Sequence, residues 1–133
     1  MMPNALLKAG LTTAVREFIS KIDEHKLKVN LGISGINERL DAQTETVLYR
    51  VIQESVNNVI KHAKASLLSI QLVKDSDGIN LSIEDNGIGF DKNSTKNGIG
   101  LENIKSRIAL INGEIEYDTA VGKGTLVNIF IPN

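Results

Sequence analysis

Residues 84–101 read EDNGIGFDKNSTKNGIGL and contain the tripeptide Gly-Ile-Gly twice, each time after an asparagine. The first copy follows an apolar run that ends at Asp85, and the second stands directly before a segment with helical periodicity. Glycine lets another group approach the main chain closely. Unpaired N–H groups at the start of a helix favour anions. The stretch therefore predicts a polar loop between two close-approach segments, with phosphate as the group expected at the helix.

Hydrophobic periodicity on both sides of this loop predicts an α/β domain. Helical spacing covers residues 11 to about 25, about 43–62 and 101–111, and the Asn112-Gly113 pair is typical of a helix C-terminus. Alternation typical of strands occurs in 26–35, 67–74, 79–85, 114–120 and 124–132, with turn sequences at 75–78 and 121–124. This order predicts an α/β (α+β) two-layer sandwich, in which three helices cover one face of a mixed, mostly antiparallel sheet of about five strands.

Composition excludes several classes of function. The chain has 133 residues, a formal net charge of -1 and no cysteine. No basic block points to nucleic acid, and disulfides, thiolate metal sites and cysteine catalysis are ruled out. The sequence contains neither a membrane-length apolar run nor a secretion signal. We expect a cytoplasmic domain without direct membrane contact; whether the full-length protein is membrane-anchored is left open.

One face of the long predicted helix carries an acid, an amide and a base. Glu54, Asn58 and Lys61 are spaced i, i+4 and i+7, which places them within a sector of roughly 60° in an α-helix. A solvated helix surface would show the same pattern. Mg²⁺ takes one or two protein oxygens plus phosphate oxygens, so Asn58 beside Glu54 would suit a magnesium nucleotide. Glu54 would orient or deprotonate a nucleophile, or hold a metal-bound water, and the spacing leaves this choice open.

Asp85 is the candidate for reading a base. It ends an apolar strand, so its carboxylate is expected to need hydrogen-bond donors, and an adenine amino group is such a donor. Thr125 opens the last strand and would support the same end of the site, although threonine is common there through β-propensity. The Asp-Asn-Gly triplet alone is equally typical of a turn with asparagine at positive φ. A Walker-type phosphate loop is absent from the sequence.

Four ordered segments resemble one family. VIQESVNNVIKHA (51–63) resembles the N box of sensor histidine kinases, IEDNGIGFD (83–91) the first glycine box, and 97–132 the second glycine box with the closing strands. These kinases belong to the GHKL ATPase superfamily, and the subgroup matched is similar to nitrate-sensor and lipid-fluidity thermosensor kinases. MPNALLKAGL (2–11) is similar to the segment that joins the dimerisation helices of that subgroup to its ATP-binding domain. The resemblance implies a linker over residues 1–10 and an ATP-binding catalytic domain over 11–133.

The resemblance also implies ATP and Mg²⁺ as ligands. Asn58 would be the magnesium ligand, and Asp85 would accept a hydrogen bond from the adenine N6 amino group. Residues of about 91–97 would form a mobile lid. The residues expected to bind the nucleotide are Asn58, Lys61, His62, Asp85, Gly87, Ile88, Gly89, Phe90, Gly98, Ile99, Gly100, Leu101 and Thr125.

Glu54 and Lys61 are the catalytic candidates. Many histidine kinases have asparagine where this chain has Glu54. A glutamate at this position resembles the general base of gyrase-type ATPases, but it is also usual in the matched subgroup of kinases. We therefore interpret Glu54 as an activator of histidine rather than of water. Neither His25 nor His62 resembles the acceptor motif. The expected function is transfer of the γ-phosphoryl group of ATP to a histidine on a separate dimerisation domain.

The expected partners are the dimerisation and phosphotransfer helices of the same full-length kinase and a response regulator receiver domain. Two alternatives remain open at this point. An anti-sigma-type protein serine kinase shares the superfamily boxes, and a non-catalytic module would bind ATP only to set the conformation of an attached domain.

Overall fold

The computed structural model describes residues 3–89 and 98–133, which fold as five strands and a layer of helices. The strands form one sheet in the order β1-β2-β3-β5-β4. The β1–β2 pair is parallel and the other pairs are antiparallel. The predicted mixed, mostly antiparallel five-stranded sheet is confirmed. Its strands are β1 Lys28–Ser34, β2 Leu67–Lys74, β3 Gly78–Asp85, β4 Glu114–Thr119 and β5 Thr125–Pro132.

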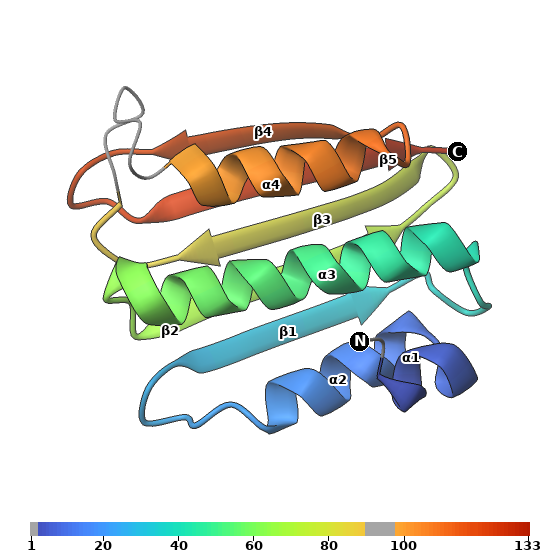
Figure 1. The fold of residues 1–133 in the computed structure, drawn as a ribbon, viewed down its shortest axis with the longest axis horizontal. Helices are drawn as coiled ribbons and strands as arrows, with labels where there is room; N and C mark the ends of the chain where they lie inside the picture. The colour runs from blue at the N-terminus through green and yellow to red at the C-terminus, as the bar shows by residue number, and fades with distance from the viewer. Residues whose placement is uncertain (1–2, 90–97) are drawn as a thin grey trace.

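The helices lie together on one face of this sheet (Figure 1). They are α1 Asn4–Ala9, α2 Leu11–Ser20, α3 Ala42–Asn58, the π-helix η1 Val59–Ala63 and α4 Gly98–Ala109. Strand alternation supplies the core, because every second residue of β2, β3 and β5 is buried under the helices. The two-layer prediction is therefore confirmed, and α1 is an addition to the three predicted helices.

The opposite face of the sheet is largely polar. Gln71 of β2, Asn80 of β3 and Asn128 of β5 are exposed on it. A Cβ on Gly32 of β1 would meet the amide end of the Gln71 side chain, which can move aside. The apolar residues of this face are scattered among the polar ones and are partly buried: Leu67, Val73, Leu126 and Phe130.

Helix α2 ends at Ser20, five residues before the predicted end near His25. The carbonyl of Asp23 accepts hydrogen bonds from the N–H groups of Lys26 and Leu27, and its carboxylate accepts one from His25 N–H at 2.9 Å. Aspartate offers the main chain these bonds in place of helical ones, and a turn results.

Residues 4–9 form α1, within the segment predicted to be a linker. Leu6 is only 2% exposed and belongs to the core cluster. These residues therefore pack as part of the folded unit. The linker boundary at residue 10 stays a prediction about the longer protein.

An ion pair with a buried carboxylate joins α1, α2 and α3. Glu45 of α3 is 3% exposed, and its carboxylate accepts hydrogen bonds from Arg39 Nη2 at 2.8 Å and from Leu11 N–H at 3.2 Å. Arg39 also donates to the carbonyl of Leu6 at 3.2 Å. Burial raises the pKa of Glu45, but Arg39 and the amides of Leu11 and Leu40 together lower it, and the net pKa lies below the ordinary value.

We predict that Glu45→Ala costs about 1–3 kcal/mol of unfolding free energy at pH 7, because it leaves the Leu11 amide and Arg39 without their acceptor. Since the pKa of Glu45 is lowered in the folded chain, this contribution is present above its ordinary pKa and is lost as pH falls through the folded value. Urea unfolding at pH 7 and in acid measures both effects. Glu17→Ala is the control, because the Glu17–Lys21 pair is exposed. Equal stability of the Glu45 and Glu17 variants at pH 7 would contradict the prediction.

Candidate nucleotide site

Glu54 and Asn58 lie on the last turns of α3, as predicted. The helix begins after Asp41, whose carboxylate accepts from Thr44 N–H at 3.3 Å, and its apolar face packs on the sheet. Glu54 and Asn58 are both partly buried, and Asn58 is the last residue of the helix. The Asn58 side chain makes no hydrogen bond with any residue in the described ranges, so its carboxamide oxygen is available to a ligand.

Helix geometry changes after Asn58, and this alters the placement of Lys61 and His62. Residues 59–63 form a π-helical turn that ends at Lys64 in the left-handed conformation, φ 50°. A π-turn closes its hydrogen bonds from i to i+5, so each residue rotates less than the roughly 100° of an α-helix. The α-helical projection that grouped Lys61 with Glu54 therefore applies only as far as Asn58, and the grouping stays a prediction. Lys61 and His62 are both exposed on η1.

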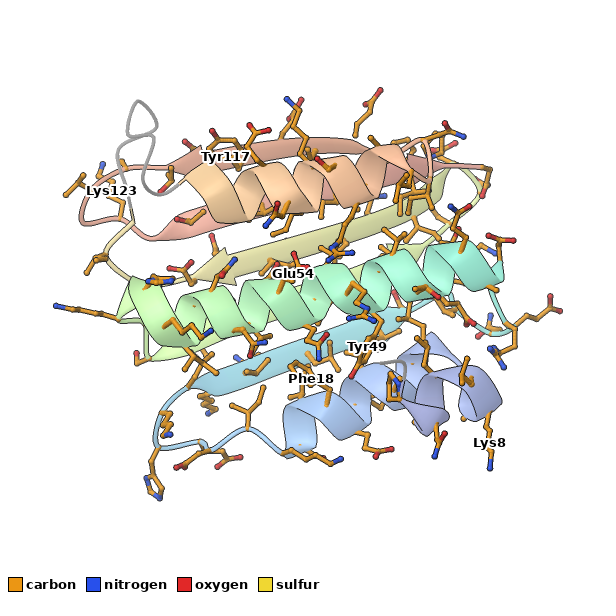
Figure 2. The ribbon with its side chains drawn as sticks, in the orientation of Figure 1. Lys8, Phe18, Tyr49, Glu54, Tyr117 and Lys123 are labelled. Carbon is orange, nitrogen blue, oxygen red and sulfur yellow. The ribbon has the colours of Figure 1, made fainter. Side chains whose placement is uncertain are left out.

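Glu54 is paired with a residue that the sequence analysis missed. Arg107 of α4 donates from Nε to Glu54 Oε1 at 2.7 Å, and its Nη2 lies 2.6 Å from the same oxygen. Figure 2 shows Glu54 on the flank of α3 that faces α4. The two residues are 53 positions apart, so no local pattern in the sequence could reveal the pair.

Asp85 points into the helical layer at the end of β3. It is 9% exposed, and its Oδ1 accepts from Gly87 N–H at 2.8 Å. Burial raises the pKa of Asp85 above its ordinary value, and the backbone amides of Gly87 and Thr125 only partly oppose this. A carboxylate has about four lone-pair positions, so these two amides leave room for a further donor.

The glycines after Asp85 serve contacts within the protein. A Cβ on Gly87 would clash with the carbonyl of Ala63, and one on Gly89 would clash with the carbonyl of Ala120. Gly89 and Gly124 also have positive φ, 63° and 74°. The close approach expected between this backbone and a base therefore has a second explanation, namely contact with η1 and with the β4–β5 turn.

Asn86 anchors the same loop through its side chain. Its Oδ1 accepts from the N–H groups of Ser66 and Leu67 at 2.9 and 3.0 Å, and its Nδ2 donates to Ser66 Oγ. Asn86 is not among the described non-glycine residues with positive φ, which are Lys64 and Asn112. The alternative of a turn with asparagine at positive φ was wrong.

The other predicted residues divide into three groups. Ile88 is 47% exposed in the loop after β3. Thr125 begins β5 beside Asp85, and its Oγ1 lies 2.8 Å from Thr119 Oγ1. Residues 98–101, which include Gly98, Ile99, Gly100 and Leu101, form the first turn of α4. Phe90 and the lid expected over about 91–97 lie outside the described residues.

These elements meet at one end of the sheet. The Ile88 N–H donates to the carbonyl of Ala63 at 2.8 Å, which ties the loop after Asp85 to the end of η1. Figure 1 shows the end of β3, η1 and the start of α4 at the same end of the domain. The carboxylate, the amide and the helix N-terminus thus share one end of the molecule.

Comparison with known families identifies the family of this chain. Residues 43–133 match the family described as histidine kinase-, DNA gyrase B-, and HSP90-like ATPase. The chain belongs to this family. The matched segment begins with α3 and includes every predicted site residue.

Curated relatives are sensor kinases. The chain is 29% identical to the oxygen sensor histidine kinase NreB of Staphylococcus carnosus over 99% of its own length and 39% of NreB. It is 33% identical to the signal transduction histidine-protein kinase/phosphatase DegS of Bacillus subtilis over 98% of its length and 36% of DegS. The chain thus spans less than half the length of these relatives.

Solved structures support the fold. The ATP binding domain of PrrB from Mycobacterium tuberculosis matches with a TM-score of 0.68 and 20% identity, covering 92% of this chain and 90% of that one. The histidine kinase domain of a blue-light activated kinase from Erythrobacter litoralis matches with a TM-score of 0.70 and 21% identity, covering 90% and 56%. Helices in the described part of this chain are all too short or too polar to cross a membrane.

We predict that Asn86→Ala costs about 1–3 kcal/mol of unfolding free energy, since it removes two main-chain bonds and one side-chain bond that hold the loop to β2. Asn80→Ala is the matched control, because Asn80 is exposed on the open face of the sheet. Thermal and urea unfolding compare the two variants. A cost for Asn86→Ala no larger than for Asn80→Ala would show that the loop does not depend on this anchor.

Proposed function

We propose that this chain is the catalytic ATP-binding domain of a sensor histidine kinase, and that it supplies the γ-phosphoryl group of Mg-ATP to a histidine on separate dimerisation helices. The observation that carries the proposal is the meeting of Asp85, Asn58 and the first turn of α4 at one end of the sheet. Membership of the ATPase family and the sensor kinase relatives support it. A response regulator receiver domain is the proposed recipient of the phosphoryl group.

Asp85 fits the adenine end of this site. Its carboxylate is buried and is held by backbone amides, so its orientation is fixed before a ligand arrives. An exocyclic amino group would take one of the remaining lone pairs and offset part of the burial cost. The carbonyl at the corresponding position of guanine offers no such donor, and the proposed selectivity for adenine follows. Ile88 and Thr125 flank the same end.

Asn58 fits a magnesium ion that is shared with phosphate. The described residues contain no group of three carboxylate or histidine side chains that would hold a metal alone. Mg²⁺ keeps several waters and binds through one or two protein oxygens together with phosphates, so a single free carboxamide suits it. Bound Mg²⁺ would neutralise phosphate charge. We propose Asn58 as its ligand. Glu54 would accept a hydrogen bond either from a metal-bound water or from the acceptor imidazole.

The phosphates are proposed to lie against the first turn of α4. The first four N–H groups of a helix lack helical acceptors, and the helix dipole favours an anion there. Lys61 and His62 are exposed on η1 at the same end, where a flexible cation can reach a phosphate without burying its charge. Phosphoryl transfer depends mainly on such positioning and charge neutralisation, and the nucleophile must come from outside this set.

We predict that Asp85→Ala lowers affinity for ATP by about 5- to 150-fold, the equivalent of about 1–3 kcal/mol for one lost hydrogen bond to a charged group. The loss should appear with and without Mg²⁺. Asn58→Ala should weaken only the magnesium-dependent part, and Asn57→Ala, an exposed neighbour, should change neither. Calorimetry with ATP, ADP and GTP measures these differences. Equal affinity for ATP and GTP, or a magnesium effect unchanged by Asn58→Ala, would contradict the assigned roles.

The proposed phosphoryl acceptor is a histidine outside this chain. His25 is exposed in the turn after α2 and His62 is exposed on η1, and neither is presented on a dimerisation helix. The chain alone should bind Mg-ATP without labelling itself, and label from γ-labelled ATP should appear on histidine when the dimerisation helices are supplied. Acid lability of the product distinguishes phosphohistidine from phosphoserine. Strong labelling of this chain alone, or acid-stable phosphoserine on the partner, would overturn the proposal.

A further inference from the structure

Arg107 places both of its contacts on one oxygen of Glu54. Nε donates to Oε1 at 2.7 Å and Nη2 lies 2.6 Å from the same atom. In the described ranges, Oε2 accepts no hydrogen bond. Two donors on one atom fix the position of Oε1, and the second oxygen stays available to another group.

The location of the pair argues against a purely stabilising role. The side chains of Glu54 and Arg107 are 28% and 40% exposed, and ion pairs open to water contribute little to stability. The Arg39–Glu45 pair differs from this pair, because the Glu45 side chain is only 3% exposed. An arginine that adds little stability but holds a functional candidate from two atoms is better explained by orientation.

Arg107 also joins the two helices that carry the site. Glu54 lies one turn before Asn58 on α3, and Arg107 lies on α4, whose first turn is the proposed phosphate site. A side chain on a helix leans towards the N-terminus of that helix, so Arg107 reaches back along α4 in the direction of the site. The pair consequently makes the position of the Glu54 carboxylate depend on the position of α4.

We propose that Arg107 is a positioning residue that holds Glu54 through Oε1 and leaves Oε2 to accept a hydrogen bond from the acceptor imidazole or from a metal-bound water. This inference rests on the proposed function and deepens it. Arg107 touches neither nucleotide nor acceptor in this role; it acts only through Glu54. Arginine suits this role because its planar guanidinium presents two donors to Oε1 at once, whereas a lysine supplies a single point contact.

The test is single-turnover transfer from γ-labelled ATP to the dimerisation helices, with Arg107→Met, Arg107→Lys, Glu54→Gln and the Arg107→Met/Glu54→Gln double variant. Lys105→Met is the control, because it removes an exposed positive charge from the same helix. Arg107→Met should slow transfer at saturating ATP by about 10- to 100-fold, as misplacement of a reacting group does. Affinity for Mg-ATP should be unchanged. Arg107→Lys should restore part of the rate, and the double variant should be no slower than Glu54→Gln.

Other results would overturn the inference. Full transfer by Arg107→Met, a rate loss matched by an equal loss of ATP affinity, or multiplicative effects in the double variant would each show that Arg107 does not act through Glu54. If the Arg107→Met variant does not fold, the transfer rate of Arg107→Lys is measured instead. An intermediate rate supports the inference, and a rate equal to that of Glu54→Gln contradicts it. Failure of the proposed function is distinguishable, since the unsubstituted chain would then leave histidine unlabelled even when the dimerisation helices are supplied, and both ideas would fall together.

Discussion

The site depends on the two-residue period of β3. Ile79, Leu81 and Ile83 point into the helical layer, so Asp85, the next residue in phase, must point there too. Burial at this position raises the pKa of the Asp85 carboxyl. The groups that oppose this shift are the backbone amides of Gly87 and Thr125, not a cationic side chain. The protein thus maintains a buried, partly satisfied acceptor at the edge of its core. Such a group is costly in the folded chain alone and becomes useful when a ligand supplies the missing donor.

The glycines after Asp85 show how one sequence feature can satisfy two requirements. Gly87 and Gly89 are needed because Ala63 and Ala120 approach them closely, before any ligand is considered. These contacts bring the loop against η1 and the β4–β5 turn, and the loop then lies where the adenine end of the site is proposed. Packing within the protein and access for a ligand therefore favour the same residue type. The tripeptide alone could not separate the two reasons.

Local patterns predicted the elements but not the contacts between them. The strands, the start of α3 and the positive-φ Asn112 after α4 follow from periodicity and turn chemistry, which act within a few residues. The π-turn after Asn58 was missed because α-helical phase was extended through it, and no residue there signals the change. Arg107 and Asn86 were missed because their partners lie far away in the sequence, 53 and about 20 positions off. Burial of Leu6, which makes α1 part of the core, likewise needs the tertiary structure.

The two ion pairs of α3 explain how a single helix can serve both stability and chemistry. Glu45 and Glu54 are nine residues apart, which at about 100° per residue places them on opposite flanks of the helix. Glu45 turns towards α1 and α2 and is sealed by Arg39, whereas Glu54 turns towards α4 and stays open to solvent. Burial of Glu45 makes the first pair part of the packed structure, since losing Arg39 leaves a carboxylate in the interior without its cation. The second pair is only partly exposed and leaves one oxygen of Glu54 unbonded by the described residues. Helix α3 is therefore anchored by one carboxylate, and the other, held by Arg107, lies next to the proposed metal site.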